Sequence, residues 1–161
     1  MKIIFGLVVM AMSMLFTANA MASTGVESVD AVTSTADYDG DYDGVISNVT
    51  MNGKSYSDED ATFTIESNVL ICDFPQIGKM PGTITVKLPI SINEATGEIT
   101  ATPGTSAGSL TLKVGGKATL YLDSLTNAKV ENGTLEFDMA VHGTYLSIIK
   151  FPASFHFKAP K

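Results

Sequence analysis

The ten residues Thr83-Ile84-Thr85-Val86-Lys87-Leu88-Pro89-Ile90-Ser91-Ile92 decide the fold class of this chain, because apolar side chains occupy every second position. Successive side chains of a β-strand point to opposite faces, whereas an amphipathic helix repeats its apolar residues at intervals of three and four. The stretch therefore predicts a half-buried strand with its aliphatic side chains on one face. Pro89 falls on the polar face, where its missing N–H is tolerated only at an edge or a bulge.

The same alternation recurs on both sides of this stretch, and the chain after residue 37 shows no helical repeat. The further runs cover residues 61–65, 109–114, 118–122, 134–141 and 154–158. The dipeptides that separate the runs are typical of turns: Asn52-Gly53, Thr96-Gly97, Gly115-Gly116, Asn132-Gly133 and His142-Gly143. About eight to ten strands at this spacing predict an all-β domain, an antiparallel barrel with a β-sandwich as the alternative.

The N-terminus has the pattern of a secretory signal peptide. Lys2 precedes an apolar run over residues 3–16, and two overlapping A-x-A cleavage sites follow in residues 18–22. The run is shorter than the roughly 20 residues that span a bilayer, so we expect no transmembrane anchor after signal removal. Cleavage is expected before Met21 or Ser23, which makes the protein exported, either periplasmic or extracellular.

This reading divides the chain into three parts. Residues 1–22 are the predicted signal peptide, and residues 23–37, which are small, polar and aperiodic, are a predicted flexible tether. Residues 38–161 are the predicted β-barrel domain.

Charge and composition exclude several classes of partner. The chain has 10 Lys and no Arg against 17 Asp and Glu, giving a net charge of −7. Nucleic-acid binding needs a basic footprint, and Arg is the residue best suited to phosphate, so no nucleic-acid partner is expected. A single Cys excludes an intrachain disulfide. Cys72 alternates with Leu70 and Phe74 on an apolar face, which predicts a buried, inert thiol.

The order of several short segments resembles a family. These segments are Tyr42-Asp43-Gly44, Asn52-Gly53, Lys79-Met80-Pro81-Gly82, residues 132–139 (NGTLEFDM) and Phe155-His156-Phe157. Together they resemble the secreted bacterial calycin-like (lipocalin-like) β-barrel domains over about residues 38–158. The resemblance implies an up-and-down barrel. Classical lipocalins carry a Gly-x-Trp near the first strand, packed against an Arg, fatty-acid carriers hold the carboxylate with Arg and Tyr, and biotin-binding barrels use Trp walls. This chain has no Trp and no Arg, so those anchoring chemistries do not carry over.

The bulkiest side chains on the apolar faces are the candidate ligand-binding residues. They either fill the barrel or line a pocket: Phe63, Phe137, Met139, Phe155 and Phe157. Such a pocket would lack a fixed cation unless a Lys points inward, and its ligands are expected to be neutral or weakly polar. The preferred hypothesis is a secreted, non-enzymatic barrel that binds a small apolar molecule. The alternative is a solid barrel whose outer face or loops bind protein or glycan, with Tyr121 as a candidate contact.

An acidic segment and one short motif leave alternatives open. Asp39, Asp41 and Asp43 match the front half of a calcium loop, but Thr50 stands where the bidentate Glu belongs. The segment predicts a solvated start of the first strand, with a weak calcium site as the alternative. Ser124 lies in a three-residue match to a bacterial O-glycosylation signal, or in an ordinary loop.

Residue types suited to catalysis are few and badly spaced. His142 and Asp138 share a face, but four residues along a strand cover about 13 Å, too far for direct contact. His156 stands between two Phe residues and is expected to meet solvent. Neither His has the spacing of a metal-binding motif. We therefore expect no enzyme activity, no metal site and no cofactor.

Overall fold

The computed structural model describes residues 38–74, 77, 82–113, 115–146 and 149–160. The chain divides into two units, Met1–Asp37 and Tyr38–Lys161, of which the second is the β-domain. The predicted signal peptide (1–22), the predicted tether (23–37) and the Lys79-Met80-Pro81 part of the family resemblance lie outside the described residues.

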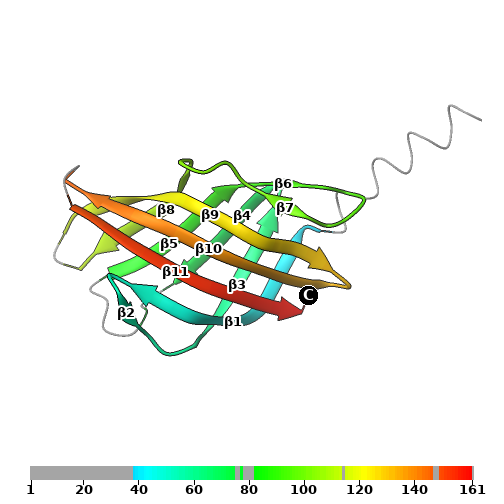
Figure 1. Ribbon diagram of the computed structural model, residues 1–161, viewed down its shortest axis with the longest axis horizontal. Coiled ribbons are helices and arrows are strands. Elements are labelled where there is room, and N and C mark those ends of the chain that lie inside the picture. Colours follow the sequence, from blue (N-terminus) through cyan, green and yellow to red (C-terminus); the bar gives the residue numbers. More distant parts are fainter. Residues whose placement is uncertain (1–37, 75–76, 78–81, 114, 147–148, 161) are drawn as a thin grey trace, which may run out of the picture. The chain divides into compact units, whose positions relative to one another are not determined.

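The described residues form strands and no helix (Figure 1). The strands are β1 (Gly40–Met51), β2 (Lys54–Ser55), β3 (Glu59–Glu66), β4 (Val69–Phe74), β5 (Gly82–Pro89), β6 (Ser91–Ile92), β7 (Ile99–Thr100), β8 (Ser106–Leu112), β9 (Lys117–Glu131), β10 (Thr134–Tyr145) and β11 (Ile149–Pro160).

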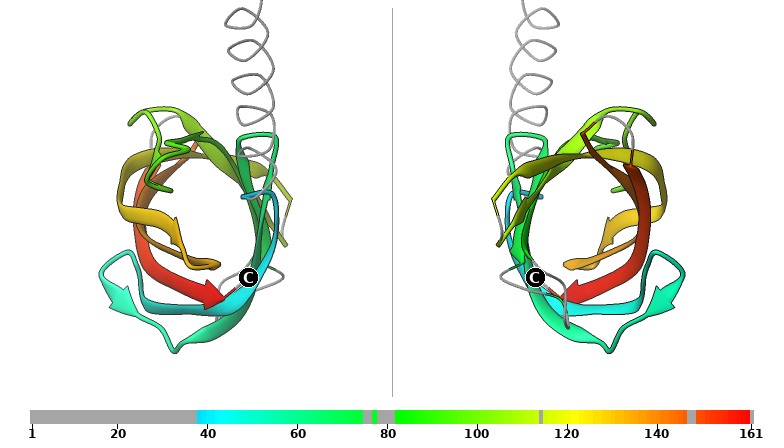
Figure 2. Two further views of the ribbon diagram at one scale, coloured as in Figure 1. Left: turned by 90° about the vertical axis from the view of Figure 1, so that its right-hand side faces the viewer. Right: turned by 90° about the vertical axis from the view of Figure 1, so that its left-hand side faces the viewer.

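Eight of these strands close into an antiparallel up-and-down barrel. Their order around the barrel is the chain order, β1-β3-β4-β5-β8-β9-β10-β11, and β11 pairs back onto β1. The short β2 adds to β1, and β6 and β7 form a separate hairpin. Viewed along its axis, the barrel forms a ring of strands (Figure 2). The predicted all-β antiparallel barrel is therefore confirmed, and the chain does not adopt the β-sandwich alternative.

The stretch that decides the fold class bends at its proline. Pro89 is the last residue of β5, opposite Val69, and the next N–H, that of Ile90, donates to the Asn68 carbonyl at 2.9 Å. The chain then leaves the barrel wall and enters β6. Val86 and Leu88 are buried, as the alternation predicts. A proline is tolerated at this point because the strand ends there and needs no further ladder bond from its nitrogen.

Two predicted hairpin turns are confirmed and one predicted turn is wrong. Asn52-Gly53 joins β1 to β2 and Asn132-Gly133 joins β9 to β10, all with positive φ angles between 50° and 76°. His142-Gly143, by contrast, lies inside β10. A Cβ atom on Gly143 would stand 2.0 Å from the ring of Phe151 on β11. Gly143 is therefore required for the close approach of an aromatic ring, and not for a turn.

The β6–β7 hairpin lies across one end of the barrel. The Val130 N–H on β9 donates to the Gly97 carbonyl at 2.9 Å, and the Tyr38 hydroxyl, just before β1, donates to the Glu94 carbonyl at 3.1 Å. Strands β1 and β9 are not neighbours in the barrel. A hairpin that is hydrogen-bonded to β9 and to the residue before β1 therefore spans this end of the barrel. We call it the closed end. The opposite end, where β1 ends at Met51 and β11 begins at Ile149, we call the mouth.

Candidate functional site

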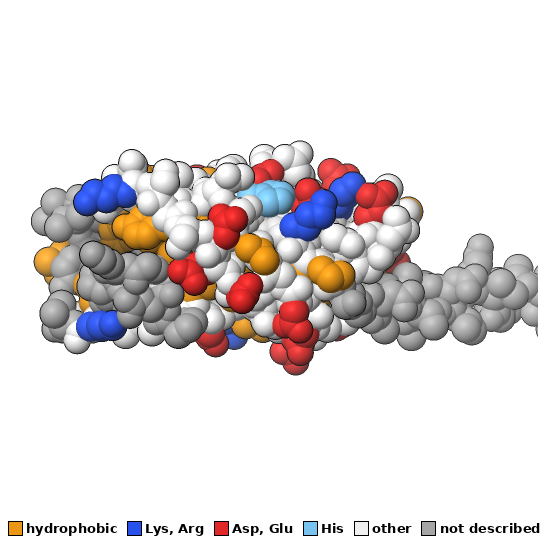
Figure 3. All heavy atoms as spheres, turned by 90° about the horizontal axis from the view of Figure 1, so that it is seen from below, with side chains coloured by type: hydrophobic (Ala, Val, Ile, Leu, Met, Phe, Trp, Pro, Cys, Tyr) orange, Lys and Arg blue, Asp and Glu red, His pale blue; other side chains and the backbone are white. Residues whose placement is uncertain are grey.

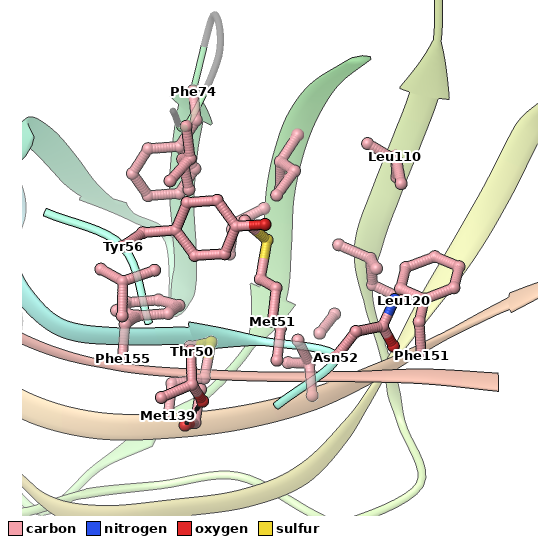
Figure 4. Close-up of a pocket in the computed structure, with 18 of the residues that line it drawn as sticks. Thr50, Met51, Asn52, Tyr56, Phe74, Leu110, Leu120, Met139, Phe151 and Phe155 are labelled. Carbon is pink, nitrogen blue, oxygen red and sulfur yellow. Dashed lines mark hydrogen bonds between the residues drawn. The ribbon is translucent and has the colours of Figure 1, made fainter. Parts of the chain in front are cut away.

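A cavity of about 330 Å³ lies inside the barrel at the mouth (Figure 4). Every barrel strand except β3 contributes side chains or backbone to its lining, together with β2 and the segments beside it. The lining residues are mostly aliphatic and aromatic: Val49, Thr50, Met51, Asn52, Lys54, Tyr56, Phe74, Ile77, Ile84, Val86, Ala107, Leu110, Leu112, Leu120, Met139, Val141, Phe151, Ala153, Ser154 and Phe155. Its size falls within the range of small-molecule sites, roughly 300–1,000 Å³.

Two of the five candidate ligand-binding residues line this cavity. Met139 on β10 and Phe155 on β11 belong to the lining, whereas Phe63, Phe137 and Phe157 do not. The latter three are 0–1% exposed and fill the barrel below the cavity. The sequence placed all five on the inner face. It could not show how deep each one lies along the barrel axis.

The three deep phenylalanines form a packed aromatic cluster. The ring centroids of Phe63 lie 5.0 Å from Phe137, in an edge-to-face arrangement, and 4.5 Å from Phe157. Phe74 and Phe155 contact Phe63 from the cavity side, with centroids at 5.7 and 6.1 Å. These two rings therefore belong both to the cluster and to the cavity floor. The barrel is solid toward the closed end and hollow toward the mouth.

A glycine on the inner face of β10 makes room for one wall of the cavity. Gly143 stands opposite Phe151 in the β10–β11 ladder, and its missing Cβ leaves the space that the Phe151 ring occupies. Figure 4 shows Phe151 and Leu120 on one side of the cavity and Tyr56 and Phe155 on the other, with Met51 between them. A larger residue at position 143 would push the Phe151 ring away from its present place.

Few polar groups reach the cavity, and they gather near its rim. Thr50 and Ser154 face each other across the β1–β11 seam, where their hydroxyls lie 2.8 Å apart and satisfy each other. Asn52 and Lys54 are exposed, and Tyr56 is half-buried. The sequence predicted a pocket without a fixed cation unless a Lys took part in it, and Lys54 is a lysine in the cavity lining. Sequence alternation missed the residues from Asn52 to Tyr56 because they belong to a turn and a two-residue strand.

The thiol of Cys72 is buried on the inner face of β4 and lies outside the cavity lining. Burial, together with the charge of the adjacent Asp73, raises the pKa of the Cys72 thiol to about 12. Because the thiolate is the reactive form, a rise in pKa from 9.0 to about 12 lowers its population on the order of a thousandfold. We expect Cys72 in the folded protein to react with a colorimetric thiol reagent much more slowly than in the urea-unfolded chain. Rapid modification in native buffer would contradict the prediction.

The acidic segment lies along a strand. β1 begins at Gly40, so Asp41 and Asp43 are strand residues on the outer face, separated by about 6.6 Å along the chain. Thr64 and Thr62 on β3 donate hydroxyl hydrogen bonds of 2.6 Å to Asp41 and Asp43, respectively. The carboxylates are thus held in a row against β3 and do not converge as in a calcium loop. Within the described residues, no group of three His, Cys, Asp or Glu side chains is placed to hold a metal ion.

Both histidines pair with carboxylates on the outer wall, through contacts between neighbouring strands. His142 Nδ1 lies 2.7 Å from Asp123 Oδ1, and His156 Nδ1 lies 2.8 Å from Asp138 Oδ1. Hydrogen bonds from Asn127 and from His156 lower the pKa of Asp138. These pairs join residues 18 and 19 positions apart, so spacing along one strand could not reveal them.

Two further candidates from the sequence also lie on this wall. Tyr121 is half-buried and stacks on the His142 ring with centroids 5.6 Å apart. Ser124 lies inside β9, opposite Ala140, and not in a loop. Neither residue lines the cavity at the mouth.

No protein-family model, curated protein or solved structure matches this chain. None of the described residues belongs to a helix with the length and hydropathy needed to cross a bilayer.

Proposed function

We propose that this barrel binds a small apolar molecule in the cavity at its mouth. The observation that carries the proposal is the cavity itself, about 330 Å³ of space enclosed mainly by aliphatic and aromatic side chains. Protein interiors are normally packed as densely as organic crystals, and the aromatic cluster toward the closed end follows that rule. A sequence that fills one half of its barrel and leaves the other half hollow has a feature that stability alone does not require.

The proposed activity is binding without catalysis. In the described part of the chain, the two His–Asp pairs lie on the outer wall, and the cavity lining contains neither His nor a carboxylate. The alternative hypothesis, a solid barrel that binds protein or glycan through its outer face or loops, depends on a filled interior. The cavity favours the ligand-binding hypothesis over it.

We also propose that the protein is an exported member of the calycin-like family. The closed up-and-down barrel supports this relationship, because it is the architecture that the resemblance implies.

The proposal of export depends on the signal-peptide pattern of residues 1–22. Intact-mass analysis of the protein recovered from the producing cells should show an N-terminus at Met21 or Ser23. A chain that keeps Met1 and sediments with membranes would contradict the export proposal.

A neutral fluorescent probe tests the binding proposal directly. N-phenylnaphthylamine is weakly fluorescent in water and bright in apolar surroundings, so entry into the cavity should raise its emission. We expect a saturable rise that corresponds to one probe molecule per folded chain, lost when the protein is unfolded in urea. If the signal rises linearly without saturation, the probe has no defined site and the proposal fails.

A further inference from the structure

Among the described residues that line the cavity, a single one is charged, and it is a cation. The chain as a whole has 17 acidic and 10 basic residues, yet none of the described lining residues is Asp or Glu, and one, Lys54, is Lys. Lys54 is exposed at the mouth, on the two-residue strand β2 that pairs with the end of β1. It therefore combines contact with water and contact with an apolar cavity.

The ammonium group of Lys54 has no carboxylate partner among the described residues. Lys129 and Lys158, toward the closed end, form ion pairs with Glu131 and Glu136, respectively. On the face shown in Figure 3, the Lys side chains at the mouth end have no acidic side chain beside them, whereas those toward the closed end lie among acidic side chains. A lysine at the rim of a binding site is thus available to an anionic group from outside.

The neighbours of Lys54 supply neutral hydrogen-bonding groups. Asn52 lies in the turn before it, and Tyr56 follows it, both in the cavity lining. Asn offers an amide donor and Tyr a hydroxyl donor, which suit the oxygen atoms of a phosphate or a carboxylate. These donors and the cation lie at the rim, whereas Leu120, Met139 and Phe155 line the cavity below.

The volume limits the apolar part of the ligand. A volume of about 330 Å³ lies at the small end of the range of small-molecule sites, roughly 300–1,000 Å³. It suits one medium-length alkyl chain better than the two long chains of a membrane lipid. Among the described residues, the site therefore combines a small, mainly apolar interior with one cation at its entrance.

We propose that the cavity binds a single-chain anionic amphiphile, with the alkyl chain among the apolar lining residues and the phosphate- or carboxylate-type head group at Lys54. This inference rests on the proposed ligand-binding function and adds the class of ligand. It replaces the expectation of a neutral ligand, which held only while no lysine faced the pocket.

Three ligands with the same tail separate the head group from the chain. Decyl phosphate, decanol and decyltrimethylammonium, each below its micelle concentration, are titrated against the mature protein by displacement of N-phenylnaphthylamine. Charge-assisted hydrogen bonds are stronger than neutral ones, and we expect decyl phosphate to bind about tenfold more tightly than decanol, with decyltrimethylammonium weakest.

The Lys54→Gln variant should lose the preference for decyl phosphate and keep its affinity for decanol. Lys87→Gln, an exposed lysine on β5 outside the cavity, is the matched control and should behave as wild type.

The outcomes distinguish this inference from the function on which it rests. If decanol and decyl phosphate bind equally well, or if Lys54→Gln keeps the preference, the anionic head group is wrong while the apolar site stands. If none of the three displaces the probe, and the probe itself does not saturate, the binding function fails as well. Cosedimentation with phosphatidylglycerol vesicles without binding of monomeric decyl phosphate would show that Lys54 meets a lipid surface, and would overturn the proposal.

Discussion

Replacing Met139 with Lys is expected to reduce binding of the neutral probe on the order of a hundredfold. Met139 is 2% exposed and lies in the cavity lining on β10, beside the aromatic cluster. An unpaired ammonium group at this depth would have to lose its hydration whenever an apolar ligand fills the space around it. Penalties of about 3 kcal/mol or more are typical of such uncompensated buried charges, and 3 kcal/mol corresponds to about two orders of magnitude in affinity. Direct fluorescence titration with N-phenylnaphthylamine measures the change.

Folding is the essential control for this variant, because the same charge could unfold the barrel. The far-ultraviolet circular dichroism spectrum must keep its β-sheet form before a loss of binding is interpreted. Met139→Leu, which conserves volume and polarity, should bind the probe nearly as well as wild type. Ala153→Phe provides an uncharged route to the same result, since it adds a ring to the half-buried lining on β11 and should block the cavity by bulk. Unchanged probe affinity in a folded Ala153→Phe variant would place the probe elsewhere.

Replacing Phe63 with Ala is expected to lower the free energy of unfolding by about 3–5 kcal/mol. The Phe63 side chain is fully buried and its ring is the centre of the aromatic cluster, in contact with Phe74, Phe137, Phe155 and Phe157. The substitution would leave a space that the neighbouring strands, closed into a ring, cannot collapse to fill. Urea denaturation followed by circular dichroism gives the change.

Phe155→Ala is the matched comparison for the Phe63 prediction. Phe155 is only half-buried and borders space that already exists, so its removal should destabilise the barrel by clearly less than the removal of Phe63. Its effect on probe binding should be the larger of the two, because it lines the cavity. Equal losses of stability would show that the two halves of the barrel are packed alike, contrary to the division into a solid and a hollow half.

Period-two alternation is strong enough to predict the fold class, and the reason is local. The side chains of Val86 and Leu88 point into the barrel because of the alternation within their own strand. The turns at Asn52-Gly53 and Asn132-Gly133 likewise depend only on the backbone angles of those residues. Gly143, by contrast, cannot be explained from the sequence of its own strand. The residue that determines its identity, Phe151, is brought opposite by the ladder between β10 and β11, and nothing within β10 distinguishes this glycine from one in a turn.

The candidate site was predicted only in part, for a similar reason. Alternation places Phe63 and Phe155 on the same inner face but gives no depth along the barrel axis, which depends on how each strand is staggered against its neighbours. Lys54 is harder still, because it belongs to a strand of two residues that has no detectable period. The pairing of His156 with Asp138 joins different strands and depends on the observed register.

The pairing of β11 with β1 has a consequence for how the barrel folds. The bonded hydroxyls of Thr50 and Ser154 belong to residues 104 positions apart, so the contact that completes the ring is also among the most distant in sequence. Folding slows as contacts become less local, because the entropy of closing a long loop is lost before the contact forms. Until β11 has been synthesised, β1 has no partner along that edge, and a nascent chain remains an open sheet. The ring can therefore close only after the last strand of the barrel has been made.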